Sequence, residues 1–409
     1  MPTPSAHARV AVATIWDANP GFACSLLHWC QDAVDFGEIL ASAGVVSSAS
    51  AVDLLLLLSG GSPEEQQDAR RTASEDCPAR MRVLLPGDEL RSAVDAFVRR
   101  GGCMKTLKTL NSAGRLRINK GRYKAIKNHS QPTVSYVLPD AVQMLFKWHF
   151  FSMVEYDLVL FADLDVQLLR PEQPRHFLAS RWRTGWNETV PLDGSTRFLG
   201  DRDLAGPLNA GLWTIAHPTA ALYTDGLRQL REAPFNVTHG FGLLGTPAEL
   251  IRNESFKWMK PLLERTRVLK SNMWGPPRIV YGDCDQGFIF WMTYVRHRLG
   301  GAKGGVPSNQ LCRFHPADDA ARDCPHTARH HYGPTKPWIL ARGASAVGKL
   351  PRISNAGRVT QYLSATRFQR LVTTSVCAAR FASWLPLLPL PVPVGTHLAN
   401  HGKYQRVGW

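Results

Sequence analysis

Several features are absent from this 409-residue sequence, and each absence excludes a class of protein. No run approaches the roughly 18 apolar residues that a membrane-spanning helix needs, and prolines interrupt the apolar segment 381–394. The eight cysteines include no C-x-x-C pair, which argues against a zinc knuckle, and no internal repeat is visible. The remaining composition, 44% hydrophobic and 20% charged, is that of a globular protein, so we expect one large domain with additions.

Acidic residues are missing from two long stretches. Residues 96–139 contain ten basic and no acidic residues, and eleven basic residues follow Asp323 with no acid among them, in a chain of net charge +15. Such stretches could bind a polyanion, whether nucleic acid, acidic glycan or anionic membrane. Alternatively they form a solvated basic face with ligands for nucleotide phosphates. No zinc finger, RNP-like aromatic signature or basic heptad helix accompanies them, so we favour the second interpretation and expect no nucleic-acid partner.

The cysteines and the N-terminus leave the compartment open. We expect most cysteines to be buried thiols, although Cys312 and Cys324 flank a polar loop and could pair under oxidising conditions. The start of the sequence lacks the pattern of a signal peptide, which makes the cytoplasm the default. The four N-x-S/T triplets point weakly toward the secretory pathway, and the Golgi lumen remains an option if the chain is incomplete.

Short apolar runs alternate with helical stretches along the first three quarters of the chain. This order predicts a mostly parallel sheet with helices on both faces. Strands are expected at 10–15, 52–58, 81–85, 158–162 and 212–216, and helices at 21–37, 140–155, 218–232 and 285–297. Two segments, 171–207 and 235–281, fit neither pattern and are expected to be long loop insertions. In open α/β sheets such loops usually cover a site beyond the carboxyl ends of the strands.

The stretch LVLFADLDVQLL (158–169) ends an apolar strand with Asp163 and Asp165. Alternate residues of a strand point to the same side, so the two carboxylates can converge where the strand ends. Their repulsion would be relieved by a divalent cation, and hard oxygen ligands favour Mg²⁺ or Mn²⁺. The alternative is an Asp-rich turn without a ligand, because D-x-D alone is common.

Three segments downstream carry further polar groups next to structural breaks. They are PLNAGLWTIAHPTAALY (207–223), YGDCDQGFIFWMTY (281–294) and HHYGPTKPW (330–338). In this order, and together with D-x-D, they resemble glycosyltransferase family 8, the glycogenin-like enzymes with a GT-A fold. The resemblance covers roughly residues 8–340, and it implies a Rossmann-like nucleotide-diphospho-sugar transferase domain there, followed by a basic, Pro-rich extension at 341–409.

The resemblance implies a metal site and a phosphate site. Asp163 and Asp165 match the family's ligands for Mn²⁺, and His330 matches the third ligand because Gly333 and Lys336 follow it at the family's spacing. Lys336 would hold phosphate. An imidazole beside two carboxylates independently favours Mn²⁺ over Mg²⁺. Alternatively, His330 has only a structural role.

Four further residues match positions that contact the donor. Lys147 lies sixteen residues before Asp163 and matches a donor-contacting lysine, although it could be an exposed helix lysine. Thr14 falls where the family holds the uracil ring. Asn209 and Gly211 fall where it grips the hydroxyls of the donor sugar, although an asparagine at this position could also form a turn.

Asp283, Asp285 and Gln286 match residues that flank the anomeric carbon of the donor sugar. Asp285 could instead serve as the N-cap of a helix that begins near Gln286, and the two roles are compatible. As a catalytic residue, Asp285 could attack the sugar covalently, or the acceptor could enter on the face from which UDP leaves. We favour same-face attack, which gives Asp285 a positioning and electrostatic role.

These matches predict a metal-dependent retaining hexosyltransferase that uses a UDP-sugar. No tyrosine lies between Tyr294 and Tyr332, where glycogenin carries the tyrosine that it glucosylates, so we expect a separate acceptor such as a glycan, another protein or a small molecule. The alternative from another class is a catalytically silent sugar- or polyanion-binding protein on the same fold.

Overall fold

A computed structural model describes the parts of the chain that form the core. The described residues are 7–18, 22–42, 44–77, 79–107, 118–119, 122–123, 134–137, 139–168, 194–201, 208–236, 240–243, 284–299, 311–314 and 328–331.

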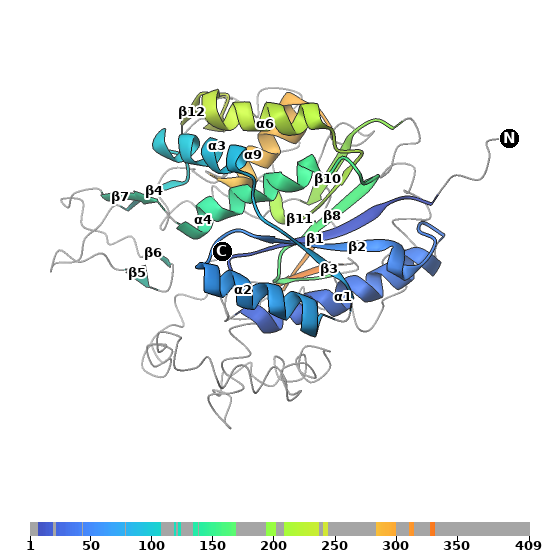
Figure 1. Ribbon diagram of the computed structural model, residues 1–409. Helices are drawn as coiled ribbons and strands as arrows, with labels where there is room; N and C mark the ends of the chain where they lie inside the picture. Colours follow the sequence, from blue (N-terminus) through green and yellow to red (C-terminus); the bar gives the residue numbers. More distant parts are fainter. Residues whose placement is uncertain are drawn as a thin grey trace.

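A six-stranded sheet forms the centre of the fold, in the order β10-β11-β8-β1-β2-β3 (Figure 1). Its members are β1 (Val10–Trp16), β2 (Val52–Leu58), β3 (Met81–Leu84), β8 (Leu158–Ala162), β10 (Arg197–Asp201) and β11 (Asn209–Ala216). The four strands from β8 to β3 are parallel, whereas β11 pairs antiparallel with β8 and with β10. The predicted α/β fold with a mostly parallel sheet is confirmed.

Both faces of the sheet are buried, which explains why its strands read as continuous apolar runs. Side chains of a strand alternate between faces, so Ala11, Ala13 and Ile15 of β1 join one core cluster, while Val10 and Val12 join the other. The first cluster is rich in aromatic rings. The second is mainly aliphatic.

Helices cover the two faces in separate layers (Figure 1). On the aliphatic side lie α1 (Ala23–Ser42), α2 (Pro63–Arg71) and a π-helical turn, η3 (Thr72–Asp76). On the aromatic side lie α3 (Asp88–Arg99), α4 (Pro139–Met144) with the 3-10 helix η4 (Leu145–Ser152), α6 (Ala220–Glu232), and α9 (Asp285–Phe290) with the π-helical η6 (Trp291–Arg296).

The segment 140–155 was predicted as one α-helix, but it changes to 3-10 geometry at Leu145. The tighter winding of a 3-10 helix changes which side chains face the sheet. Lys147 in this segment is only 2% exposed, so it is not the exposed helix lysine that the sequence allowed as an alternative. The same segment buries Trp148, Phe150 and Phe151 against the sheet and its helices.

Two helices were not predicted, although one carried a clear signal. Before α2, the Ser62 hydroxyl accepts a hydrogen bond from the Glu65 amide (3.2 Å), and the Glu65 carboxylate accepts one from the Ser62 amide (2.7 Å). With Pro63 as the first helical residue, this capping box marks the start of α2. The helix α3 was also missed.

Shorter strands complete the described structure. One three-stranded sheet, in the order β14-β15-β9, joins β9 (Val166–Gln167), β14 (Leu311–Phe314) and β15 (Ala328–His331). Three two-stranded pairs are β12 (Phe235–Asn236) with β13 (Gly240–Phe241), β4 (Met104–Leu107) with β7 (Val134–Val137), and β5 (Ile118–Asn119) with β6 (Arg122–Tyr123). Most of the predicted insertions, and all of 341–409, lie outside the described residues, so the domain limit at 340 stays a prediction. No helix in the described part combines the length and apolarity that crossing a bilayer requires.

Two of the eight cysteines are not free thiols. Cys103 and Cys284 form a disulfide bond although 181 positions separate them in the sequence. Cys30 is a buried free thiol, as predicted. Cys324 lies outside the described residues, so its pairing with Cys312 stays a prediction.

Candidate active site

The candidate site lies at the edge of the sheet where the parallel strands end. The strand β8 ends at Ala162, and the next residues form a turn in which the Val166 amide donates to the Asp163 carbonyl (2.9 Å). Because β11 runs antiparallel to β8, its first residues reach the same edge, where the Asp163 amide donates to the Gly211 carbonyl (2.8 Å). The D-x-D segment and the Asn209–Gly211 segment are therefore neighbours. The carboxylates belong to a turn rather than to a strand, and their convergence on one ion stays a prediction.

Lys147 joins three segments at this edge. Its ammonium donates to the Asp163 carboxylate (3.1 Å) and to the Ala210 carbonyl oxygen (3.2 Å), and it forms an ion pair with Asp285 (3.1 Å). The lysine side chain is 2% exposed, against 22% for Asp163 and 14% for Asp285. An ammonium has three N–H bonds, and these three acceptors account for them.

The charges of this cluster depend on one another. Burial alone would lower the pKa of Lys147, but the carboxylates of Asp163 and Asp285 outweigh it and raise the pKa above its ordinary value. Lys147 is therefore charged at neutral pH. One ammonium between two carboxylates leaves the three side chains with a net negative formal charge, and Asp165, 5% exposed, adds another carboxylate nearby in sequence.

Asn209 and Thr14 are both buried at strand ends that reach this edge. The Asn209 side-chain oxygen accepts a hydrogen bond from the Gly211 amide (2.8 Å), so the predicted turn-forming role is present. Thr14 is fully buried, and its hydroxyl has no hydrogen-bond partner among the described residues. An unpartnered buried hydroxyl is uncommon, so Thr14 remains a candidate for contacting a ligand.

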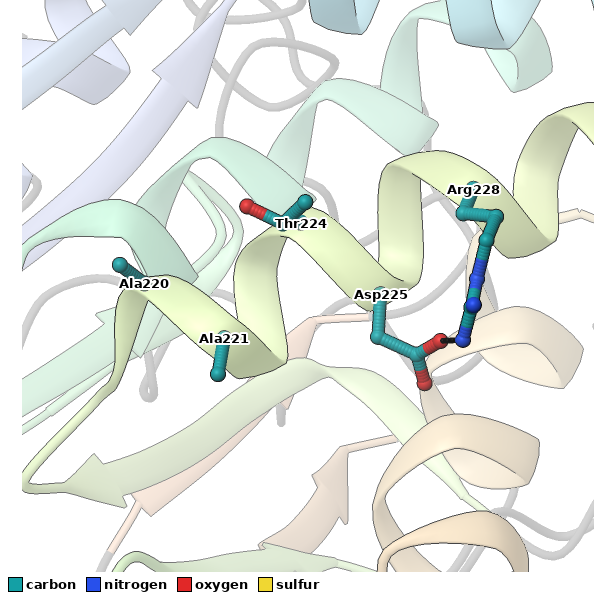
Figure 2. A pocket seen from close by; sticks show the side chains of 5 residues that line it. All are labelled: Ala220, Ala221, Thr224, Asp225 and Arg228. Carbon is teal, nitrogen blue, oxygen red and sulfur yellow. Dashed lines mark hydrogen bonds and ion pairs between the residues drawn. The ribbon is translucent and has the colours of Figure 1, made fainter.

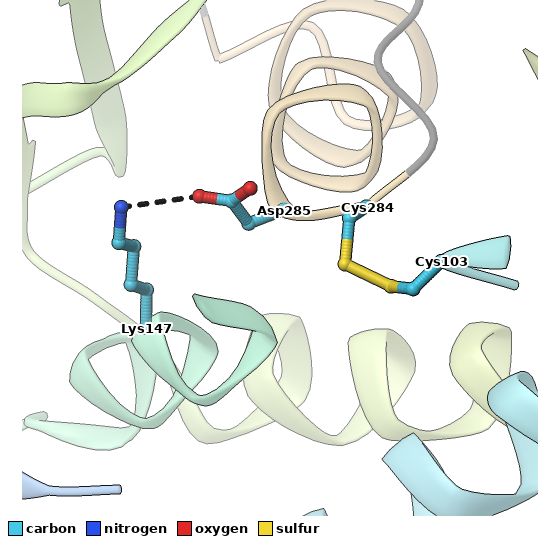
Figure 3. Close-up of a disulfide and its surroundings, with 4 residues drawn as sticks. All are labelled: Cys103, Lys147, Cys284 and Asp285. Atoms are coloured by element: carbon cyan, nitrogen blue, oxygen red, sulfur yellow. Dashed lines mark ion pairs between the residues drawn. A yellow bond between two sulfur atoms is a disulfide. The ribbon is translucent and has the colours of Figure 1, made fainter. Parts of the chain in front are cut away.

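Asp285 lies at the first residue of α9 and does not cap it. Cys284 occupies the N-cap position, so the proposed capping role of Asp285 is wrong. Its carboxylate instead points across to Lys147, while Cys284 reaches in the other direction to Cys103 (Figure 3). Gln286, the next residue of α9, is half-buried.

The backbone of His330 lies beside the D-x-D turn. In the pairing of β15 with β9, His330 is opposite Val166, the residue that follows Asp165. A strand far along the chain thus reaches the segment that carries the two aspartates, and two carboxylates with an imidazole suit Mn²⁺. Among the side chains that the structure describes, which do not include that of His330, no group of three potential ligands is already assembled.

Three predicted site residues, Asp283, Gly333 and Lys336, lie outside the described residues, so their roles stay predictions. Three other groups at the site were not predicted. They are the Ala210 carbonyl, the Cys103–Cys284 bond and Asp32 of α1, whose carboxylate accepts a hydrogen bond from the Leu168 amide after β9 (3.1 Å). Their residue types do not identify these groups as part of the site, because each of them acts through a contact between segments that are distant in the sequence.

A separate hollow of about 430 Å³ runs along the first half of α6, between Ala220 and Arg228 (Figure 2). It lies toward the opposite edge of the sheet, since α6 follows the end of β11, where the His217 amide donates to the Asp157 carbonyl (2.9 Å). Its one carboxylate, Asp225, is engaged by Arg296 (2.6 Å) and other neighbours. This arrangement indicates a structural ion-pair cluster rather than a second binding site.

Comparison with known proteins gives matches in structure only. No protein-family model matches the chain, and no curated protein matches it in sequence. The galactosyltransferase LgtC, solved in complex with donor and acceptor sugar analogs, aligns at 14% identity over 92% of this chain and 100% of LgtC, with a TM-score of 0.35. Mouse xyloside xylosyltransferase 1 aligns at 11% identity over 81% of this chain and 98% of its own, with a TM-score of 0.34.

A third match is the glycosyltransferase GlyE of Streptococcus pneumoniae TIGR4, at 9% identity over 94% of this chain and 64% of GlyE, with a TM-score of 0.32. All three are glycosyltransferases. At these identities and TM-scores the likeness does not by itself assign a family or an activity, so the resemblance to family 8 stays a prediction.

Proposed function

We propose that this chain is a metal-dependent retaining glycosyltransferase, which moves a hexose from a UDP-sugar to a separate acceptor. The observation that carries the proposal is the cluster around Lys147. One buried ammonium binds the D-x-D segment, the Asn209–Gly211 segment and the start of α9, and these segments are far apart in sequence. The ammonium gathers two carboxylates and one backbone carbonyl from these segments at the edge where α/β proteins bind ligands.

Asp163, Asp165 and His330 are the proposed ligands of a Mn²⁺ ion. The ion, when bound, supplies Lewis-acid stabilisation of the departing diphosphate. The negative formal charge of the cluster supports this assignment, as does the position of His330 opposite Val166. Lys336 is proposed to bind a phosphate group of the same diphosphate.

Lys147 is proposed as a positioning residue. Because its three N–H bonds are directed at Asp163, Ala210 and Asp285, it acts on the donor through them. It fixes the distance between the segment that holds the metal and the helix that holds the sugar.

Asp285, Gln286 and Asn209 are proposed to bind the hydroxyls of the donor sugar, and Thr14 the nucleobase. The carboxylate of Asp285 is paired with a buried ammonium at 3.1 Å, and this pairing lowers its power as a nucleophile. Its proposed role is therefore to orient the sugar and to stabilise positive charge developing at the anomeric carbon. Retention then follows from attack by the acceptor on the face from which UDP leaves.

The test is Mn²⁺-dependent hydrolysis of a panel of UDP-sugars by the full chain. We expect at least one UDP-sugar to be hydrolysed, EDTA to abolish the reaction, and Asp163→Asn and Asp165→Asn to lower kcat by at least about 100-fold. Arg71→Met, a change in an exposed ion pair on α2, is the control and should retain the rate. Wild-type rates in both aspartate variants would refute the metal assignment. Mn²⁺-dependent binding of UDP without turnover of any sugar would instead support a silent binding protein.

A further inference from the structure

The Cys103–Cys284 disulfide lies one residue from Asp285 (Figure 3). Cys284 is the residue before α9, and it makes no side-chain hydrogen bond that caps the helix. Asp285 must nevertheless keep its carboxylate 3.1 Å from the Lys147 ammonium. The covalent bond is therefore the strongest constraint described at the start of this short helix.

The other end of the bond follows a hydrogen-bonded helix end. The helix α3 ends in a Schellman motif, in which Gly101 has a φ of +88°, its amide donates to the Val98 carbonyl (2.9 Å), and the Gly102 amide donates to the Phe97 carbonyl (3.0 Å). This turn places Cys103, 1% exposed, directly after the helix.

Two contacts anchor that turn to the rest of the aromatic core. The Arg100 guanidinium donates to the carbonyls of Leu230 (2.6 Å) and Ala233 (2.7 Å), which would otherwise be unpaired at the end of α6. The Phe97 ring stacks on Phe241 with 4.9 Å between centroids. A fixed Cys103 thus transmits its position through the disulfide to Cys284.

We propose that the Cys103–Cys284 disulfide is a positioning device for Asp285, which makes sugar turnover depend on the oxidised bond. The inference rests on the proposed role of Asp285 in holding the donor sugar. A displacement of about 1 Å at a reacting centre can cost about 100-fold in rate, so loss of a covalent restraint one residue away has a measurable effect. A bond of this kind persists in oxidising compartments and is reduced in the cytosol.

The reductant in the test is tris(2-carboxyethyl)phosphine. It breaks the S–S bond, the phosphorus takes its oxygen from water to become the phosphine oxide, and each sulfur leaves as a thiol. Alkylation of the thiols and peptide mass analysis verify that the bond between Cys103 and Cys284 is broken.

The experiment compares the oxidised full chain, the reduced full chain and the Cys103→Ser/Cys284→Ser double variant. Three quantities are measured: the Kd for UDP with Mn²⁺, kcat and KM for hydrolysis of UDP-glucose and UDP-galactose, and amide hydrogen exchange over 285–290. We expect the Kd for UDP to stay within about twofold, kcat to fall at least tenfold, and the 285–290 amides to exchange at least tenfold faster in both altered forms. A bond that only stabilised the fold would lower the melting temperature without this separation of kcat from UDP binding.

Two control variants isolate the effect. Cys30→Ala/Cys77→Ala removes the two thiols in the opposite core, and it should respond to the reductant as the wild type does. Asp225→Asn loosens the far end of the same helical segment, at Arg296, and should lower stability while leaving kcat within twofold.

Unchanged kcat in protein whose bond is verifiably broken would overturn the proposal. If the oxidised chain hydrolyses neither UDP-sugar, the proposed function is in question. The exchange measurement still tests whether the disulfide positions Asp285. Faster exchange at 285–290 after reduction supports it, and unchanged exchange overturns it.

Discussion

Removing the Lys147 ammonium gives the sharpest test of the site as a charge cluster. In Lys147→Met, Asp163 and Asp285 would face each other without the cation that lies 3.1 Å from each of them. Because the lysine is only 2% exposed, water cannot readily replace it. Breaking a buried ion pair by removing one partner costs about 3–5 kcal/mol, and we expect a loss of that size in the free energy of unfolding.

Urea denaturation followed by tryptophan fluorescence measures this loss. The matched control is Arg71→Met, whose partner Asp68 is 64% exposed and whose loss should cost less than about 1 kcal/mol. Lys147→Arg keeps the charge but adds bulk, so it should recover part of the stability. If Lys147→Met destabilised the protein no more than Arg71→Met, the cluster would not be held by charge.

The pH dependence of the same comparison gives a second check. The pKa of Lys147 is raised in the folded state, since the two carboxylates outweigh the effect of burial. The contribution of this charge to the free energy of unfolding is then fully present below the pKa of about 10.4 that a lysine has in the unfolded chain. It is lost as the pH rises through the higher pKa of the folded state. The stability difference between wild type and Lys147→Met should therefore be constant from neutral pH to about pH 10 and shrink above it. A difference that shrank below pH 9 would contradict the assignment.

Two further variants test the aromatic side of the fold. Burial would raise the pKa of Asp225, but hydrogen bonds from Arg296, Arg228 and other side chains outweigh it and lower the pKa overall. The contribution of Asp225 to the free energy of unfolding is therefore present above about pH 4 and is lost on acidification. Asp225→Asn should cost about 1–3 kcal/mol at pH 7 and reduce the loss of stability below pH 4, measured by urea denaturation. Gly226→Ala would bring a methyl group within 2.2 Å of the Trp148 ring, so we expect a loss of about 1–3 kcal/mol and a lower kcat, because Trp148 adjoins Lys147. A fully stable Gly226→Ala protein would mean that α6 and η4 separate easily.

The sheet could be predicted from sequence because its signal is local. Each parallel strand is buried on both faces and therefore reads as an apolar run, as in Leu158–Ala162, which was predicted at its observed limits. The end of that run also located Asp163 and Asp165 at the edge of the sheet. The antiparallel direction of β11 brings Asn209 to the same edge, and no residue type in β11 specifies that direction.

The contacts inside the site could not be predicted in the same way. The surroundings of Lys147 depend on contacts with Asp163, Ala210 and Asp285, which lie on segments far apart in the sequence. The partner of Cys284 depends on where α3 ends in space, because cysteine spacing does not determine connectivity. The backbone carbonyl of Ala210 could not be predicted as a partner of Lys147, because a sequence pattern identifies side chains and not backbone groups.

The long separation between Cys103 and Cys284 also bears on how the protein is made. Synthesis proceeds from the N-terminus, so Cys103 leaves the ribosome well before its partner, 181 residues later, has been added. During that interval Cys103 carries a free thiol that can pair with other cysteines. An oxidoreductase able to exchange wrong disulfides would therefore raise the yield of correctly folded recombinant protein.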